Sequence, residues 1–127
     1  MKILLTGSSG FIGRYLKNKI EIDHPSTTII PIVRVNKSLT PKCNSLIIPS
    51  INANTFWGDK IYGFDCVIHC AARVHVMNDT VDDPLEAFRE VNVQGTLTLA
   101  KAAAESGVKR FIFVSSIKVN GESTTDL

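Results

Sequence analysis

The sequence feature that most constrains the fold is a glycine loop, G-x-x-G-x-x-G, at residues 7–13. It follows a short apolar run at residues 2–6, which indicates a fully buried strand. Residues 11–22 come next with apolar side chains at helical spacing, so the loop joins a strand to a helix. A glycine loop in this context binds phosphate, because the helix start offers free N–H groups and a positive dipole end. The loop therefore predicts a dinucleotide site.

Each glycine of the loop has an expected role. Gly7 supplies a turn with positive φ, Gly10 lets the backbone approach a pyrophosphate, and Gly13 lets the helix pack against the sheet. The hydroxyls of Ser8 and Ser9 add hydrogen-bond donors. The alternative interpretation is a tight strand–helix turn that binds no ligand.

The rest of the chain alternates strands with helices. Further strands are expected at residues 28–35, 45–48, 66–70 and 111–114, with one or two helical turns within residues 53–62. A long helix is expected to begin with Asp83 as N-cap and Pro84 as its first residue, and to end at Gly107. Gly95 within it marks a close approach of another segment. This alternation predicts an α/β fold, a doubly wound parallel sheet of the Rossmann type with about five strands, in one domain over residues 1–127.

The composition excludes several classes of function. A chain of 127 residues, 44% of them hydrophobic, makes one globular domain with a buried core. Its 14 basic and 12 acidic residues nearly balance, which argues against binding to nucleic acid or to a membrane surface. No apolar run reaches the roughly 18 residues of a membrane span, and the N-terminus does not form a signal-peptide core. A cytoplasmic location is therefore expected.

The three cysteines predict neither a disulfide framework nor a metal site. Cys43, Cys66 and Cys70 are odd in number and irregular in spacing, which suits a reducing compartment. Cys66, His69 and Cys70 share one expected strand, where residues four apart are separated by roughly 13 Å, too far to share a zinc ion. We therefore expect no metal, and thiols that pack as small hydrophobic groups.

The segment after the first helix bears on which dinucleotide is bound. In NAD-binding proteins an acidic residue about 20 positions after the loop binds the ribose 2′-hydroxyl. Residues 24–58 contain no Asp or Glu, and Arg34 stands where that acid is expected, with Lys37 close behind. A cation at this place favours a 2′-phosphate. We therefore expect NADP as the cofactor, with NAD, its ribose bound by Asn36 or Ser38, as the second choice.

Three further motifs follow the glycine loop. Residues 65–72 form an apolar strand that ends in H-x-A-A, residues 92–96 have the pattern N-x-x-G-T, and residues 113–121 carry two adjacent serines after a strand. Together with T-G-S-S-G-F-I-G at residues 6–13, they resemble the extended short-chain dehydrogenase/reductases, which form the nucleotide-sugar epimerase/dehydratase family. The order and spacing of the motifs match that family across residues 2–121.

The resemblance implies a cofactor contact for individual residues. The pyrophosphate would be surrounded by Gly7, Ser9, Gly10, Phe11 and Ile12. Arg34 would face the adenosine ribose. Ala71 and Ala72 would let the backbone lie close to the cofactor, and Ser115 would lie near its nicotinamide end.

Two residues take catalytic positions by the same resemblance. Ser116 would be the catalytic Ser/Thr that hydrogen-bonds the substrate hydroxyl or ketone, and Asn92 would lie on the long helix near the active site. From the residues alone, Ser115 and Ser116 are also explained as the end of a strand, and Asn92 as a polar residue on an exposed helix face. His69 by itself is explained as a buried strand residue.

The family's mechanism also uses a tyrosine and a lysine in a Y-x-x-x-K helix after the serine. The tyrosine transfers a proton while the nicotinamide transfers a hydride, and a nearby cation lowers the tyrosine pKa. The chain has one such match, Tyr15 and Lys19, but it lies in the first helix and is rejected as catalytic. We therefore expect the N-terminal, NAD(P)-binding part of a UDP-sugar 4-epimerase, dehydratase or 4-keto reductase, without its substrate domain and catalytically incomplete alone. The alternative is a non-catalytic NAD(P)-binding sensor or interaction module.

The expected partner of the full-length parent is a nucleotide sugar. Residues 73–77 resemble family members that act on UDP-linked N-acetyl sugars in surface-polysaccharide pathways. A fifth strand left at the edge of the sheet is open to association, which allows a homodimer.

Overall fold

The computed structural model describes residues 1–34, 44–74 and 82–121. Within these residues a parallel sheet contains five strands, β1 (Lys2–Thr6), β2 (Thr28–Arg34), β3 (Leu46–Ile48), β4 (Cys66–His69) and β5 (Arg110–Phe113). The strand order is β3-β2-β1-β4-β5, and each neighbouring pair is parallel. The doubly wound α/β fold expected from the sequence is confirmed.

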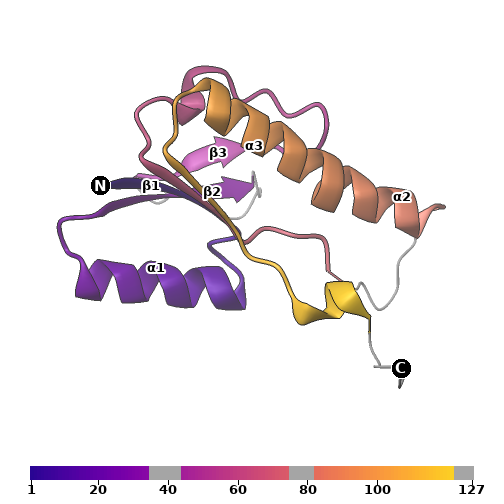
Figure 1. Cartoon of the computed structure of the whole chain (residues 1–127), viewed down its shortest axis with the longest axis horizontal. Helices are drawn as coiled ribbons and strands as arrows, with labels where there is room; N and C mark the ends of the chain where they lie inside the picture. The colour runs from indigo at the N-terminus through magenta and orange to yellow at the C-terminus, as the bar shows by residue number, and fades with distance from the viewer. Residues whose placement is uncertain (35–43, 75–81, 122–127) are drawn as a thin grey trace.

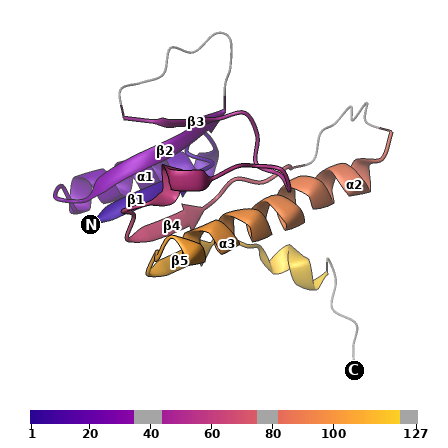
Figure 2. The same ribbon diagram turned by 90° about the horizontal axis from the view of Figure 1, so that it is seen from above.

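Helices cover both faces of the sheet (Figure 1). α1 (Phe11–Asp23) lies on one face. On the other face α2 (Pro84–Arg89), a π-helical segment (Glu90–Gly95) and α3 (Thr96–Glu105) follow one another as a single rod, as Figure 2 shows. No helix within the described ranges is long and apolar enough to cross a membrane.

The core has two layers because successive strand residues point to opposite faces of the sheet. The layer toward α3 consists of buried residues from strands, loops and the helix itself: Leu4, Ile32, Ile48, Ile51, Trp57, Ile61, Phe64, Val67, Leu99 and Ala103. The layer toward α1 consists of Ile3, Leu5, Ile29, Cys66 and Ile68, with Leu16 and Ile20 of α1 packed against it. Burial on both faces is the reason that the central strands are almost wholly apolar.

The boundaries of the five strands and of α1 lie within one residue of those expected. Residues 53–62 contain a single 3₁₀ turn, Gly58–Ile61. Asp83 caps α2, since its Oδ1 accepts the Glu86 N–H at 3.0 Å, and Gly107 follows α3 with a φ of 73°. The predictions made for residues 35–38, for Cys43 and for residues 75–77 fall outside the described residues.

The long helix differs from the expected one in its middle. Instead of continuing as an α-helix, the chain forms six π-helical residues, Glu90–Gly95. At this point the rod meets the loop after β3. Glu90 Oε1 accepts the Ala53 N–H at 3.1 Å, and a Cβ at Gly95 would lie 2.8 Å from Ile51 Cγ2 and 3.0 Å from the Ile51 carbonyl oxygen. The close approach predicted at Gly95 is confirmed, and the bulge lies where this contact is made.

We expect Gly95→Ala to lower the free energy of unfolding by about 1–3 kcal/mol, because the new Cβ overlaps Ile51. Alanine is the better helix former by about 1 kcal/mol, so any loss of stability measures the overlap. Urea denaturation followed by circular dichroism gives the value. Gln94→Ala at the exposed preceding residue is the control and should change stability by less than about 0.5 kcal/mol. A Gly95→Ala variant as stable as the control would show that the close approach is not required.

Candidate functional site

The glycine loop and the turn after β4 meet at the carboxyl edge of the sheet. β2 lies on one side of β1 and β4 on the other, so the winding direction changes between β1 and β4. Doubly wound sheets bind ligands at this switch point. The contact is close, since a Cβ at Gly7 would lie 2.7 Å from the Ala71 amide nitrogen and 2.7 Å from the Cys70 carbonyl carbon. The structure thus brings together two motifs that are far apart in the sequence.

The loop conformation explains why two of its positions are glycine. Gly7 has the positive φ that the sequence predicts, 68°. Its carbonyl accepts the Gly10 N–H at 3.0 Å. A Cβ at Gly13 would collide with that same carbonyl, so the helix can start this close to the sheet only with glycine there. A Cβ at Gly10 would meet only the Gly7 carbonyl oxygen, at 3.3 Å, so the role expected for Gly10 depends on a ligand.

The amino end of α1 faces this loop without a side-chain cap. Gly10 is the N-cap residue and no side chain bonds to the first turn. The first helical bond runs from the Arg14 N–H to the Gly10 carbonyl at 3.0 Å, which leaves the amides of residues 11–13 without helical acceptors. Arg14 Nη2 also donates to the Ser9 carbonyl at 2.9 Å and ties the helix to the loop. Such a helix end is suited to bind an anion.

Beneath the two loops, buried polar side chains link β1, β4 and α3. Thr6 and His69 are register partners at the ends of β1 and β4, and they are 0% and 1% exposed. Thr6 Oγ1 lies 2.6 Å from His69 Nδ1. The same oxygen accepts the amides of Cys70 at 3.2 Å and Ala71 at 3.0 Å. On the far side of the ring, His69 Nε2 lies 3.0 Å from Thr96 Oγ1. A side chain of β1 therefore holds the turn after β4.

His69 is neutral in these surroundings. Burial lowers the pKa of its imidazole to about 4, because desolvation disfavours the charged form. Phe111 and Phe113 of β5 lie beside the ring, at centroid distances of 6.2 and 5.8 Å. The interpretation of His69 as a buried strand residue is confirmed.

Cys66 of β4 and Cys70, directly after β4, do not share a site with His69. Both cysteines pack in the layer toward α1, while the His69 ring bonds to Thr96 on the α3 side. Burial raises the pKa of the Cys66 and Cys70 thiols. Across the part of the chain that the structure describes, no three His, Cys, Asp or Glu side chains gather into a group that could hold a metal ion.

Asn92 holds the turn after β4 from its other end. Its Oδ1 accepts the Arg73 N–H at 2.7 Å, and its Nδ2 donates to the Arg73 carbonyl at 3.0 Å. Asn92 lies in the π-helical segment, where its own carbonyl accepts the Thr96 hydroxyl at 2.8 Å. The interpretation of Asn92 as a polar residue on an exposed face is wrong, because its side chain is bonded to the main chain of the turn.

Ser115 and Ser116 follow β5 at the same edge of the sheet. The preceding residue, Val114, donates its N–H to the His69 carbonyl at 3.1 Å. The serine loop therefore leaves the sheet beside the turn that carries Ala72. Both serines and Ala72 are exposed.

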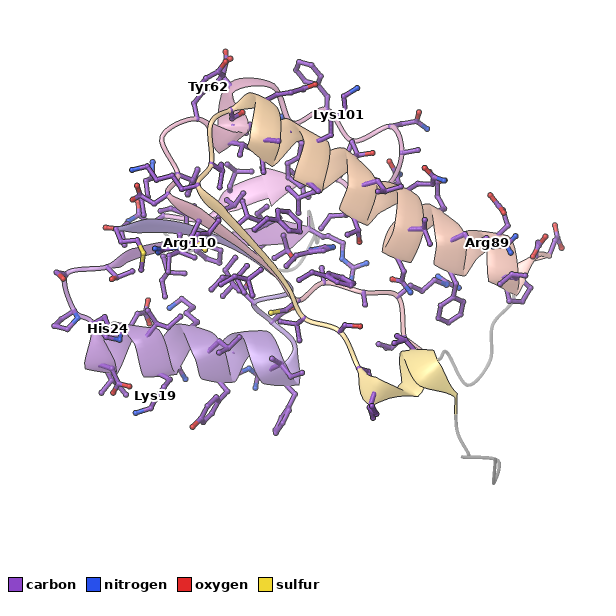
Figure 3. All side chains as sticks on the ribbon, viewed as in Figure 1. Lys19, His24, Tyr62, Arg89, Lys101 and Arg110 are labelled. Atoms are coloured by element: carbon purple, nitrogen blue, oxygen red, sulfur yellow. The ribbon has the colours of Figure 1, made fainter. Side chains whose placement is uncertain are left out.

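The remaining candidates lie on β2 and α1. Arg34 is the exposed last residue of β2, whereas Lys37 lies outside the described residues. Tyr15 is 65% exposed, and Lys19 Nζ lies 2.7 Å from the Asp23 carboxylate. Figure 3 shows Lys19 pointing away from the sheet. This placement agrees with the rejection of the Y-x-x-x-K match on α1.

The linked set Thr6, His69 and Thr96 was not predicted from the sequence. A signal was available, since Thr6 and His69 are polar residues at the carboxyl ends of two strands that are apolar apart from Lys2. The register that makes them partners depends on the pairing of β1 with β4, which the sequence pattern alone does not specify.

Comparisons with known proteins agree with this geometry. Residues 3–126 match the model of the NAD dependent epimerase/dehydratase family. The chain is 46% identical over 123 residues to UDP-glucose 4-epimerase of Vibrio cholerae, covering 96% of this chain and 37% of that protein. The chain thus spans little more than a third of the length of this relative.

Solved structures show the same fold. A short-chain dehydrogenase/reductase superfamily protein from Agrobacterium tumefaciens with bound NAD is 28% identical, with a TM-score of 0.69 over 95% of this chain and 34% of that one. A UDP-galactose 4-epimerase is 29% identical, with a TM-score of 0.68 over 98% of this chain and 41% of that one.

His69 predicts a pH dependence of stability. Its pKa is about 4 in the folded chain and about 6.5 in an unfolded one, so the unfolded state binds more protons between these values. The free energy of unfolding should therefore fall as the pH is lowered from about 6.5 to about 4, by up to about 1.4 kcal/mol per pH unit. Urea denaturation at a series of pH values measures this slope. His69→Gln should remove this contribution, and an unchanged slope in that variant would assign it to other groups.

Proposed function

We propose, since the chain belongs to the NAD dependent epimerase/dehydratase family, that residues 1–127 form the dinucleotide-binding domain of an enzyme that moves a hydride on a nucleotide sugar. The observation that carries the proposal is the contact between the glycine loop and the turn after β4, where a Cβ at Gly7 would lie 2.7 Å from the Ala71 amide. This contact lies at the switch point of the sheet, where a dinucleotide crosses from one half of the fold to the other.

The pyrophosphate binds at the glycine loop in this proposal. The residues that surround it are Gly7, Ser9, Gly10, Phe11, Ile12 and Gly13. The positive φ of Gly7 and the uncapped start of α1 support the assignment, because both turn main-chain N–H groups toward an anion. Ala71 and Ala72 form the opposite side of the site, where small side chains leave the backbone accessible.

The reacting end of the site lies at the loop after β5. When bound, the nicotinamide accepts or donates the hydride. Ser116 hydrogen-bonds the substrate hydroxyl or ketone, with Ser115 beside it near the nicotinamide. Asn92 contributes by holding the Arg73 main chain, through bonds of 2.7 and 3.0 Å. The tyrosine and lysine of the family's mechanism have no assigned counterpart in residues 1–127.

The substrate is a UDP-linked hexose. The 46% identity to a UDP-glucose 4-epimerase supports this class, and it favours interconversion at the sugar 4-position over dehydration or net reduction. The activity belongs to the whole protein, because the chain spans only 37% of that relative.

The cofactor is NADP, with NAD as the alternative. Arg34 at the exposed end of β2 supports NADP, because a guanidinium there pairs with a 2′-phosphate. The Agrobacterium structure with bound NAD makes NAD the competing candidate.

Calorimetric titration of the chain with NADPH and with NADH tests the cofactor. NADPH should bind more tightly, and Arg34→Ala should weaken NADPH about tenfold, as expected for loss of a charge-assisted contact of about 1.5 kcal/mol. The Kd of Arg34→Ala for NADH should stay within about twofold of the wild-type value, because NADH carries no 2′-phosphate for Arg34 to bind. Arg110→Ala is the control, since Arg110 begins β5, which β1 and β4 separate from β2. Tighter binding of NADH would make NAD the cofactor.

Ser116 is tested in the whole protein. Ser116→Ala should lower kcat for interconversion of UDP-glucose and UDP-galactose about 100-fold, because the hydroxyl acts on the reacting oxygen. Dinucleotide affinity should be unchanged. Ser26→Ala, at an exposed position between α1 and β2, is the control and should keep full activity. Dinucleotide binding without turnover of any UDP-sugar by the whole protein would favour a non-catalytic binding module instead.

A further inference from the structure

We propose that His69 is a positioning residue that fixes the turn after β4 relative to the π-helical segment that contains Asn92. The inference rests on the function proposed above, which assigns both segments to one dinucleotide site. His69 is 1% exposed, so it acts through its neighbours Thr6 and Thr96 rather than on the bound molecule itself.

The contact with Thr6 sets the tautomer of the ring. A threonine hydroxyl has one proton and two acceptor positions. The amides of Cys70 and Ala71 occupy both acceptor positions of Thr6 Oγ1. The Thr6 proton is therefore directed at His69 Nδ1 across 2.6 Å, and that nitrogen accepts it. A neutral His69 then carries its own hydrogen on Nε2.

The contact with Thr96 continues in the same direction. His69 Nε2 donates to Thr96 Oγ1 across 3.0 Å, and the Thr96 hydroxyl donates to the Asn92 carbonyl across 2.8 Å. Each group in this series donates once to the next, so the series is complete only with the Nε2–H tautomer. A low pKa for His69, about 4, keeps the ring neutral and the series intact at physiological pH.

The side chain of Asn92 connects this series of hydrogen bonds back to the turn after β4. It bonds both main-chain polar groups of Arg73, at the far end of the turn whose first amides are held by Thr6. The turn at residues 70–73 is thus held at one end from β1 and at the other from the helix. His69, directly before the turn, connects the two residues that hold it.

This closed set of bonds predicts that a change at Thr96 reaches the turn. Without the Thr96 hydroxyl, the Nε2 hydrogen is buried without its acceptor, and the ring can pair this hydrogen again only by moving. A moved ring no longer accepts the Thr6 proton across 2.6 Å. The Thr6 hydroxyl then loses its fixed orientation, and its bonds to the Cys70 and Ala71 amides weaken.

The test compares Thr96→Val with Thr98→Val. Both hydroxyls donate to the carbonyl four residues earlier at 2.8 Å, that of Thr96 to Asn92 and that of Thr98 to Gln94. Of the two, it is Thr96 that contacts His69, so Thr98→Val controls for loss of the helical bond. Thr96→Ser restores the hydroxyl and is the rescue variant.

Three measurements report on the coupling between Thr96 and the turn after β4. NMR of the ring nitrogens identifies the His69 tautomer, amide hydrogen exchange reports on the turn, and calorimetry gives the Kd for NADPH. The wild type, Thr98→Val and Thr96→Ser should keep the Nε2–H tautomer. Thr96→Val should speed exchange at Cys70 or Ala71 at least about tenfold. It should also weaken NADPH binding about three- to tenfold, an effect that Thr98→Val should not show.

Three results would overturn the proposal. One is a Thr96→Val variant with the exchange rates and NADPH affinity of Thr98→Val. Another is a wild-type ring with its hydrogen on Nδ1. The third is a Thr96→Val effect of the same size in a His69→Leu background, where no ring is left to transmit it. If the wild-type chain binds no NADH or NADPH, the function proposed above fails instead. The tautomer and the exchange rates still decide on His69, because neither requires a dinucleotide.

Discussion

The hydrogen bond between Thr6 and His69 is the interaction on which the arrangement of the candidate site depends. It joins the last residues of β1 and β4, where the glycine loop and the turn after β4 leave the sheet side by side. Since both side chains are buried, each of their polar atoms needs a partner inside the protein. Those partners are main-chain amides of the turn and a hydroxyl of α3. Burial of polar groups thus sets the relative position of three elements.

The parts of the fold that depend on neighbouring residues were predictable from the sequence. An apolar run that ends in glycine, or apolar residues at helical spacing, is a local signal, and the strands and α1 followed it. The long helix begins after Asp83 and ends before Gly107 as expected, because capping needs only adjacent residues. The loop conformation at Gly7 was predictable for the same reason, and the family resemblance added the correct family.

The partners in contacts between distant residues were not predictable. The π-helical segment interrupts a stretch whose spacing indicates a continuous helix. The close approach at Gly95 was predicted, but its partner Ile51 and the bonds of Asn92 to Arg73 were not, because both partners belong to other elements. The resemblance pointed to Asn92 but not to the main-chain groups that it holds. The roles of Ser116 and Arg34 remain predictions, because they concern molecules that bind to the protein.

The closed set of hydrogen bonds limits how this sequence can drift during evolution. An apolar residue in place of Thr6 would leave two amides without an acceptor and His69 Nδ1 without its donor. Loss of His69 would leave the Thr6 hydroxyl proton without its acceptor. A single replacement in this set therefore leaves buried polar groups without partners, which lowers stability. Arg34, exposed at the end of β2, stands outside the set. Under the role proposed for Arg34, one substitution there would change cofactor preference and leave the bonds that hold the turn after β4 in place.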